Sequence, residues 1–346
     1  MISTSPQSDS NHREGGFTLV ELLVAVAILA MIVGLLLTMV SQTSKTWKST
    51  SGKIEQFRDA RVAFDAITRK LGQATLNTYY DYDNPTNPTS YMRQSELRFL
   101  CGPADTIIGG LASNKPSMAV FFQAPVGFAT NSTNSLLQNT LNTWGYFVEY
   151  ASDANNRPDF LNGGVPKARE RYRLMEFMEP TESLSVYNYT TNRSYAGTDW
   201  VSNSLALPEE TRPVHVLAEN VIALILLPKL APGDMTNKYT ASSLAPDYVY
   251  SSANTNQTDP YINPHHQLPP VVQVTMIAVD ETSFVRYPGY LQDITNQYGS
   301  LFQDSSMLTN DLSTLQKSLS SHKINYRVFT TDVMIKEATW SKNQKH

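Results

Sequence analysis

Residues 16–40 read GFTLVELLVAVAILAMIVGLLLTMV and decide the fold of the N-terminal part of this chain. From Phe17 to Val40 every side chain is uncharged except that of Glu21. A helix of this length rises about 36 Å, which is enough to cross a hydrocarbon core of roughly 30 Å with some tilt. The stretch therefore predicts a transmembrane helix. A carboxylate inside such a helix is costly and usually marks a function or has a partner, so Glu21 is a candidate functional residue.

The residues before this stretch differ from a secretory signal. Such a signal places a small-residue cleavage site after an apolar core of about 7–15 residues. Here the small residues Gly15-Gly16 come before a longer apolar run, and the leader Met1–Gly16 carries Arg13 as its only arginine or lysine. Two alternatives follow: an anchor that is never cleaved, or a leader that is removed on the N-terminal side of the helix.

The segment Gly16-Phe17-Thr18-Leu19-Val20-Glu21 resembles the cleavage and methylation motif of type IV pilins and type II secretion pseudopilins. The resemblance implies that a membrane prepilin peptidase cuts between Gly16 and Phe17, and that the same enzyme methylates the new amine of Phe17. It also places Glu21 where the family has an assembly glutamate. That carboxylate would meet the N-terminal amine of a neighbouring subunit, and the pairing would offset the desolvation of both charges.

The composition narrows the classes of function. The chain has 346 residues, a formal net charge of −4 and 17% charged residues, below the usual ~25%. A nucleic-acid partner is not expected, because such a protein needs a basic patch. The single cysteine, Cys101, excludes an intrachain disulfide. It is either a nucleophile or, as we expect, a small buried residue on a strand.

After the anchor the sequence predicts an amphipathic helix. No proline occurs from Lys45 to Leu76, and apolar residues recur there at spacings of three, four and seven. This apolar stripe consists of Ile54, Phe57, Phe64, Ile67 and Leu71. The expected solvated face consists of Arg58, Asp59, Arg61, Asp65, Arg69 and Lys70.

Segments rich in aromatic and β-branched residues predict a mostly antiparallel sheet packed on this helix. They are Glu96–Cys101, Ser117–Gln123, Thr143–Ala151, Arg171–Met178, Asn220–Leu227, Val271–Asp280 and Ile324–Ile335. In the third of these, one face is expected to carry Trp144, Tyr146, Val148 and Tyr150. Polar stretches predict long loops at Asn131–Gln138, Tyr187–Ser204 and Ala231–Gln267. Leucines at 308, 312, 315 and 319 predict a late helix, which either lies on the domain or binds a partner.

The order of these parts is similar to that of the J-type minor pseudopilins. The segments that carry this resemblance are Phe64–Arg69, the aromatic strand in mid-chain, Leu217–Val221 and Leu268–Val274. The ending Ile324–Phe329 also resembles a verrucomicrobial group of prepilin-motif cassette proteins. Both resemblances imply a pilin-like α+β fold with a structural role.

The rest of the chain offers weaker candidates for chemistry. Asp81, Asp83 and Asn84 could supply oxygen ligands to calcium, but the full calcium-loop spacing is absent and a capped turn is expected. The adjacent His265 and His266 lack further His or Cys ligands at zinc spacing. No hydrolase, metalloprotease or phosphate-loop motif occurs, so we expect no catalytic residue, no metal and no cofactor.

Five tyrosines in loop-like stretches leave two readings open. They are Tyr79, Tyr80, Tyr82, Tyr248 and Tyr250. They could form a contact surface for carbohydrate or protein, or they could pack into the core as tyrosines often do.

The expected organisation is a prepilin leader over residues 1–16, a transmembrane helix over 17–40 and a pilin-like domain over 41–346. We expect a single-pass inner-membrane protein with its domain in the periplasm or outside the cell. The expected function is that of a minor pseudopilin-like subunit of a type II secretion or type IV pilus-like filament, with other pilins as partners. The alternatives are a surface pilin that acts in adhesion or DNA uptake through its loops, and a membrane-anchored enzyme.

Overall fold

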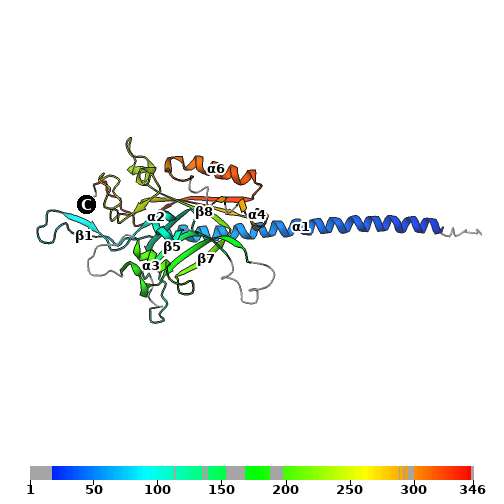
Figure 1. Ribbon diagram of the computed structural model, residues 1–346, viewed down its shortest axis with the longest axis horizontal. Coiled ribbons are helices and arrows are strands. Elements are labelled where there is room, and N and C mark those ends of the chain that lie inside the picture. The colour runs from blue at the N-terminus through cyan, green and yellow to red at the C-terminus, as the bar shows by residue number, and fades with distance from the viewer. Residues whose placement is uncertain are drawn as a thin grey trace, which may run out of the picture. The chain divides into compact units, whose positions relative to one another are not determined.

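The computed structural model describes residues 18–343, except 113, 135, 136, 138, 153–167, 188–197, 288, 291, 292 and 295–299. By its internal contacts the chain forms two compact units, Met1–Ile54 and Glu55–His346. One long helix comes first, and the later elements are antiparallel strands with short helices between them (Figure 1). The predicted α+β class is therefore confirmed.

Helix α1 (Leu19–Leu71) contains the apolar stretch and also the first amphipathic segment of the domain. It ends earlier than the predicted Leu76. The N–H of Gly72 still bonds to the carbonyl of Thr68 at 3.0 Å, but the N–H of Thr75 bonds to the carbonyl of Gln123 at 2.9 Å. The backbone thus leaves the helix because a distant strand supplies its next hydrogen-bond partner.

The predicted apolar stripe on the last turns of α1 is confirmed where its side chains are described. Phe64, Ile67 and Leu71 are buried in the core of the second unit, and Phe57 packs against that core while partly exposed. These positions lie three or four residues apart, as one face of a helix requires. The small residues Ala60 and Ala63 on the same turns are also buried.

Lys70 departs from the predicted solvated face of α1. Its Nζ lies 2.7 Å from Oε1 of Glu176 and 3.5 Å from the centroid of the Trp144 ring. The side chain is less than a quarter exposed. The ammonium is therefore held between a carboxylate and an aromatic face, both of which belong to strands.

Within the described residues, the second unit contains three antiparallel sheets. A six-stranded sheet has the order β7-β6-β5-β4-β3-β9. It is built from β3 (Leu100–Pro103), β4 (Met118–Ala124), β5 (Asn142–Ser152), β6 (Glu170–Glu179), β7 (Val214–Glu219) and β9 (Tyr250–Ser251). A three-stranded sheet is built from β8 (Val221–Lys229), β10 (Val271–Val279) and β11 (Tyr326–Met334), with β10 in the middle. A separate hairpin is built from β1 (Tyr79–Tyr82) and β2 (Tyr91–Gln94).

Six of the seven predicted strands are confirmed to within two residues at each end. The seventh, Glu96–Cys101, is wrong over its first part, because β3 begins at Leu100. The N–H of Arg98 donates to the side-chain oxygen of Gln123 at 2.8 Å, and the N–H of Phe99 donates to the hydroxyl of Ser252 at 2.9 Å, so side chains take the bonds that a strand ladder would need. Strands β1, β2, β7 and β9 were not predicted.

Short helices fill the connections between strands. They are α2 (Ala104–Ile108), α3 (Asp199–Leu205), α4 (Glu281–Arg286) and α6 (Leu308–Ser321), with 3-10 turns at Gly109–Ala112, Thr181–Ser183, Ser185–Tyr187, Pro232–Asp234, Ala241–Leu244 and Ser305–Met307. The predicted leucine helix is α6, and it lies on the domain because Leu308, Leu315 and Leu319 are buried. Parts of the predicted loops Asn131–Gln138 and Tyr187–Ser204 lie outside the described residues, and α3 begins within the second.

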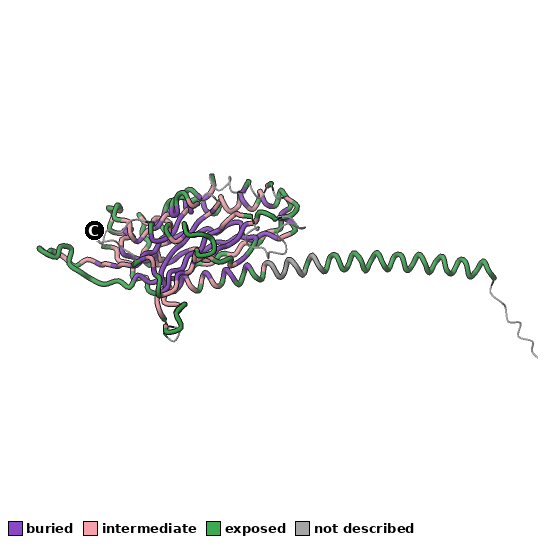
Figure 2. Tube along the Cα trace, turned by 60° about the horizontal axis from the view of Figure 1, so that its bottom comes forward, coloured by how far each residue is buried: buried purple, intermediate pink, exposed green. Residues whose placement is uncertain are grey.

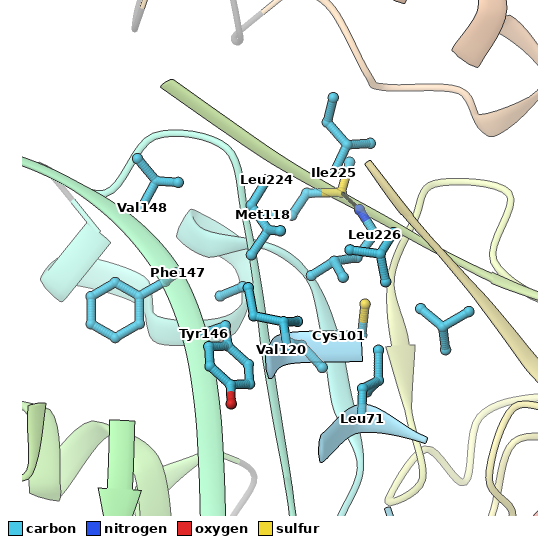
Figure 3. Close-up of a cluster of buried hydrophobic side chains, with 14 of the residues drawn as sticks. Leu71, Cys101, Met118, Val120, Tyr146, Phe147, Val148, Leu224, Ile225 and Leu226 are labelled. Atoms are coloured by element: carbon cyan, nitrogen blue, oxygen red, sulfur yellow. Dashed lines mark hydrogen bonds between the residues drawn. The ribbon is translucent and has the colours of Figure 1, made fainter. Parts of the chain in front are cut away.

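The core lies where α1, the six-stranded sheet and β8 meet. Figure 3 shows these side chains around Cys101; the labelled ones are Leu71, Met118, Val120, Tyr146, Phe147, Val148, Leu224, Ile225 and Leu226. Of the predicted β5 face, Trp144, Tyr146 and Val148 are buried and Tyr150 is partly buried. The opposite face is buried as well, because Phe147 on it packs towards Phe121, and Phe121 meets Trp200 of α3.

Gly145 allows the close packing of this second face. A Cβ added there would lie 2.2 Å from Cδ1 of Phe121 and 3.1 Å from Cβ of Phe177. We expect Gly145→Ala to lower the free energy of unfolding by about 1–3 kcal/mol, because the Phe121 ring must move inside a filled core. Chemical denaturation of the full chain in detergent measures this loss.

Gly233→Ala is the matched control for that variant. Nothing lies within 4 Å of a Cβ added at Gly233, so its denaturation midpoint should stay at the wild-type value. Equal midpoints for the Gly145 and Gly233 variants would contradict the packing described for β5.

Candidate functional site

The N-terminus of α1 is capped by Thr18, which directly precedes the helix, and by Glu21 in its first turn. The backbone N–H and the hydroxyl of Thr18 both donate to Oε2 of Glu21, each at 2.9 Å. In return, the N–H of Glu21 donates to Oγ1 of Thr18 at 3.3 Å. This reciprocal pair is a capping box, and it provides acceptors for two N–H groups at the helix start.

Thr18 is a residue of this site that was not predicted. The signal was present in the sequence, because Thr-x-x-Glu directly before an apolar run is a known helix-start pattern. The predicted processing residues Gly16 and Phe17 lie outside the described residues, as does the predicted leader 1–16. The described part of the site therefore consists of Thr18, Glu21 and the helix that they begin.

Glu21 keeps capacity for another partner. Its Oε2 takes both bonds from Thr18, whereas Oε1 accepts no hydrogen bond from the described residues. A carboxylate has about four lone-pair sites, so a further donor can bind without breaking the cap. Glu21 is also the only charged residue between Thr18 and Val40.

From Leu22 to Val40 the helix that follows is apolar on every side. The part suited to span a membrane by length and composition is Leu19–Trp47, and its most apolar stretch of 18 residues has a mean hydropathy of 2.9. Its large apolar residues are exposed, and Figure 2 colours this part of α1 as exposed. Its polar Thr38 bonds to the carbonyl of Leu35 at 2.7 Å, so this hydroxyl is satisfied within the helix. A helix that is apolar all round needs lipid or other apolar helices around it.

The turn between β1 and β2 is held by acidic and amide side chains. Asp83 accepts from the hydroxyl and the N–H of Thr89 and from the N–H of Ser90. These hydrogen bonds, chiefly that from the Thr89 hydroxyl, lower the pKa of Asp83. Asn84 accepts from the N–H groups two and three residues further on. The predicted capped turn is confirmed.

The five tyrosines divide between the two readings. Tyr248 and Tyr250 are buried in the core. Tyr79, Tyr80 and Tyr82 are exposed on the β1–β2 hairpin, together with Tyr91. The rings of Tyr82 and Tyr91 stack with centroids 4.9 Å apart. The hairpin thus presents aromatic rings to solvent.

Cys101 is a core residue, as expected from its strand. It is fully buried in β3, and burial raises the pKa of its thiol. A thiol that stays protonated and inaccessible is a poor nucleophile. Among the described residues, no three His, Cys, Asp or Glu side chains lie together in a way that could hold a metal ion.

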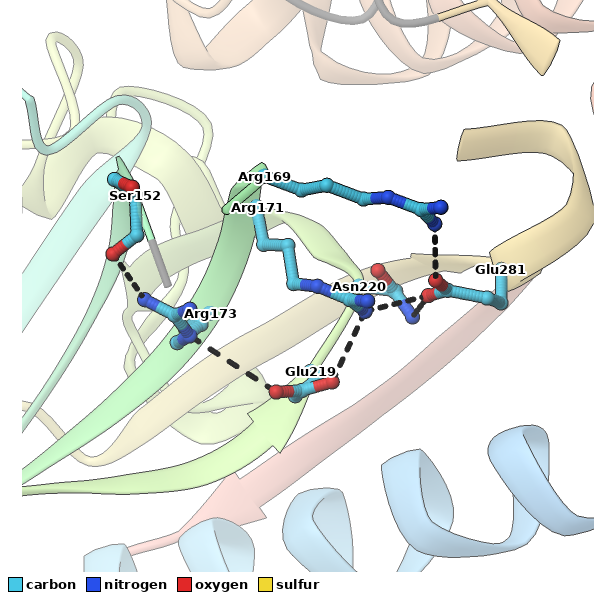
Figure 4. A network of polar contacts seen from close by, with 7 residues as sticks. All are labelled: Ser152, Arg169, Arg171, Arg173, Glu219, Asn220 and Glu281. Carbon is cyan, nitrogen blue, oxygen red and sulfur yellow. Dashed lines mark hydrogen bonds and ion pairs between the residues drawn. The ribbon is translucent and has the colours of Figure 1, made fainter. Parts of the chain in front are cut away.

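The segment Leu217–Val221 joins the two larger sheets. Asn220 has a left-handed backbone with φ of 60°, and its N–H donates to the carbonyl of Tyr172 at 2.8 Å. Its side-chain amide donates to Glu281 of α4 at 3.0 Å, and Arg171 of β6 donates to the same carboxylate at 2.7 Å (Figure 4). Asn tolerates this conformation better than most residues. The segment therefore has a structural role, in which β7 ends in one sheet and β8 begins in the other.

One comparison with known proteins finds a match. A family model described as a prokaryotic N-terminal methylation motif matches residues 11–37. No curated protein and no solved structure matches the chain. The matched residues include the predicted processing site and Glu21, and they run into the apolar helix. The chain thus carries a prepilin-type N-terminal segment, which supports a pilin-like or pseudopilin-like protein.

Proposed function

We propose that this chain, which begins with a prepilin-type segment, is a minor pseudopilin-like subunit of a type II secretion or type IV pilus-like filament. The observation that carries the proposal is helix α1. Its first part is an exposed apolar helical segment with one acidic residue, Glu21, in the first turn. Its last turns pack in the core of the folded domain. This combination suits a subunit that is stored in a membrane and then packed into a filament core.

Processing and membrane insertion give each part of the chain a location. A prepilin peptidase removes residues 1–16 and methylates Phe17, and the helix that starts there holds the protein in the inner membrane as a single span. The domain that follows faces the periplasm or the cell exterior. The protein assembles with other filament subunits and contacts them. It is processed by the prepilin peptidase but catalyses no reaction itself.

Glu21 has the central part in assembly. Inside a bundle of apolar helices, its free Oε1 would accept from the positively charged amine of a neighbouring subunit. Because both charges lie in low dielectric, each costs less when paired than when alone. A wrong register leaves both charges unpaired, so the same contact sets the position of each new subunit.

The size of the domain favours a place at the tip of a filament. The second unit spans residues 55–346 and contains two large sheets, a hairpin and several connecting helices. Such a head hinders the close stacking that a shaft subunit needs. A few copies at one end avoid this obstacle.

A second function is favoured by the tyrosines of the β1–β2 hairpin. Exposed rings such as those of Tyr80 and Tyr91 can stack on sugars or on protein side chains. A surface pilin with an adhesive role would use them. Tyr80→Ser together with Tyr91→Ser would then weaken attachment of cells while leaving filament assembly intact.

Quantitative co-purification from solubilised membranes tests the proposed function. We expect the chain to bring down other subunits with prepilin-type N-termini, and to be present in far fewer copies than the most abundant of them. Comparable copy numbers would indicate a shaft subunit. The absence of any such subunit from a cross-linked preparation would contradict the filament role.

A further inference from the structure

A small polar cavity of about 40 Å³ lies at the base of the β1–β2 hairpin. Four segments far apart in the sequence line it, through Leu76, Asn77, Thr78, Arg93, His266, Leu268, Glu337 and Thr339. A buried water needs roughly 10–15 Å³, so the cavity exceeds the space of one water. Its lining is mostly polar, and two of its members are buried side chains that carry nitrogen donors.

Arg93 is the buried cation of this cavity. The side chain is on β2, and the residue is 8% exposed. Its Nη1 donates to Oε1 of Gln267 at 3.1 Å and to the carbonyl of Thr339 at 2.8 Å. Both partners are neutral. Nε and Nη2 donate to no described residue, and they are not among the buried side-chain atoms that lack a partner, so they face solvent-accessible space. A buried guanidinium whose described partners are neutral and which keeps spare donors is suited to an anion.

His266 supplies a second donor to the same cavity. It is 4% exposed, and its Nδ1 has no hydrogen-bond partner among the described residues. Burial, helped by the charges of His265, Arg98 and Arg93, lowers the pKa of His266 to about 3. The ring is therefore neutral at neutral pH, and with its proton on Nδ1 it donates one hydrogen bond.

We propose that this cavity binds a small inorganic anion between the guanidinium of Arg93 and the ring N–H of His266. The small volume of the cavity suits a chloride or inorganic phosphate ion better than a carboxylate carried on a peptide. The one acid in the lining, Glu337, is exposed, so it repels the anion without filling the cavity.

The bound anion would join parts of the domain that meet only in the tertiary structure. Arg93 connects β2 to the C-terminal segment through Thr339, while Thr78 directly precedes β1. An isolated two-stranded hairpin is only marginally stable. An anion at its base would therefore stabilise the hairpin and the C-terminal segment together, whether or not the chain is a filament subunit.

The test is anion titration of the full chain in detergent, with gluconate as the bulky counter-anion that keeps the ionic strength constant. Chloride is followed by the line width of its ³⁵Cl NMR signal, and inorganic phosphate by calorimetry. Both probes are also followed by the melting temperature. We expect a saturable signal for at least one of them, accompanied by a rise in melting temperature.

Three variants define the site. Arg93→Gln should weaken binding by about tenfold or more, because it removes a charged hydrogen-bond donor. Glu337→Gln should strengthen binding, because it removes the nearby negative charge. Arg286→Gln removes an exposed cation from α4, outside the cavity lining, and should change nothing.

Several results would overturn the proposal. If neither probe gives a saturable signal with the wild-type chain, the cavity holds water only. If Arg93→Gln binds as tightly as wild type, the anion lies elsewhere. Should Arg93→Gln fail to fold, Glu337→Gln still decides, since weaker or unchanged binding by this exposed variant contradicts the site.

Discussion

Glu21→Gln should leave the chain in the membrane but reduce its co-purification with other prepilin-type subunits by about tenfold or more. The substitution removes the charge, and the amine of the neighbouring subunit then enters an apolar bundle without a counter-charge. Membrane insertion is not harmed, because the helix becomes less polar. The measurement is the amount of partner subunits recovered per copy of this chain from the same membranes.

Glutamine is chosen because it preserves the cap. Its side-chain oxygen can still accept from the N–H of Thr18, as Gln does in other capping boxes. A loss of assembly in Glu21→Gln would then come from the missing charge and not from a frayed helix start.

Thr18→Ala is the matched variant that weakens the helix cap but keeps the charge of Glu21. It removes the hydroxyl that accepts from the N–H of Glu21, while the carboxylate stays. We expect assembly to continue, because the docking charge remains. If Thr18→Ala abolishes assembly and Glu21→Gln does not, the cap matters more than the charge, and the docking role of Glu21 is wrong.

Gly16→Val should prevent removal of the leader. A peptidase must approach the backbone closely on both sides of the bond that it cuts, and glycine permits this approach while a β-branched side chain obstructs it. We expect the cleaved fraction to fall by about tenfold or more, and the chain to begin at Met1. Intact-mass and N-terminal analysis of the membrane-extracted protein measures both.

The neighbouring glycine provides the control. Gly15→Val adds the same side chain one residue earlier and should still yield a chain that begins at N-methylated Phe17. A mature N-terminus in the Gly16→Val protein would place cleavage elsewhere. Because uncleaved chains lack the amine at Phe17, Gly16→Val should also lose partner subunits, as Glu21→Gln does.

The sequence was sufficient for the features that are local. The anchor is one uninterrupted apolar run, and the motif Gly16–Glu21 is six consecutive residues, so no distant contact is needed to find either. The stripe of α1 and six of the strands also follow from spacing and residue type. The cap by Thr18 was equally readable, because its two members lie three residues apart.

Tertiary contacts decided the rest, since their partners lie far away in the chain. Helix α1 ends before Leu76 because Gln123 offers a carbonyl to Thr75. Lys70 leaves the solvated face because a strand presents Glu176 to it, 106 residues later. Residues 96–99 resemble a strand by composition, yet the side chain of Gln123 takes the backbone N–H of Arg98.

The base of the β1–β2 hairpin shows most clearly which features the sequence predicts and which the tertiary structure decides. Arg93 read alone is an ordinary surface cation, and the sequence gives no reason to bury it. In the fold it meets the carbonyl of Thr339, 246 residues away, and lines one cavity with His266. Periodicity along a chain predicts which face of an element is apolar, because that depends only on neighbours in sequence. Which polar groups end up buried together depends on how the sheets pack, and only the tertiary structure decides that.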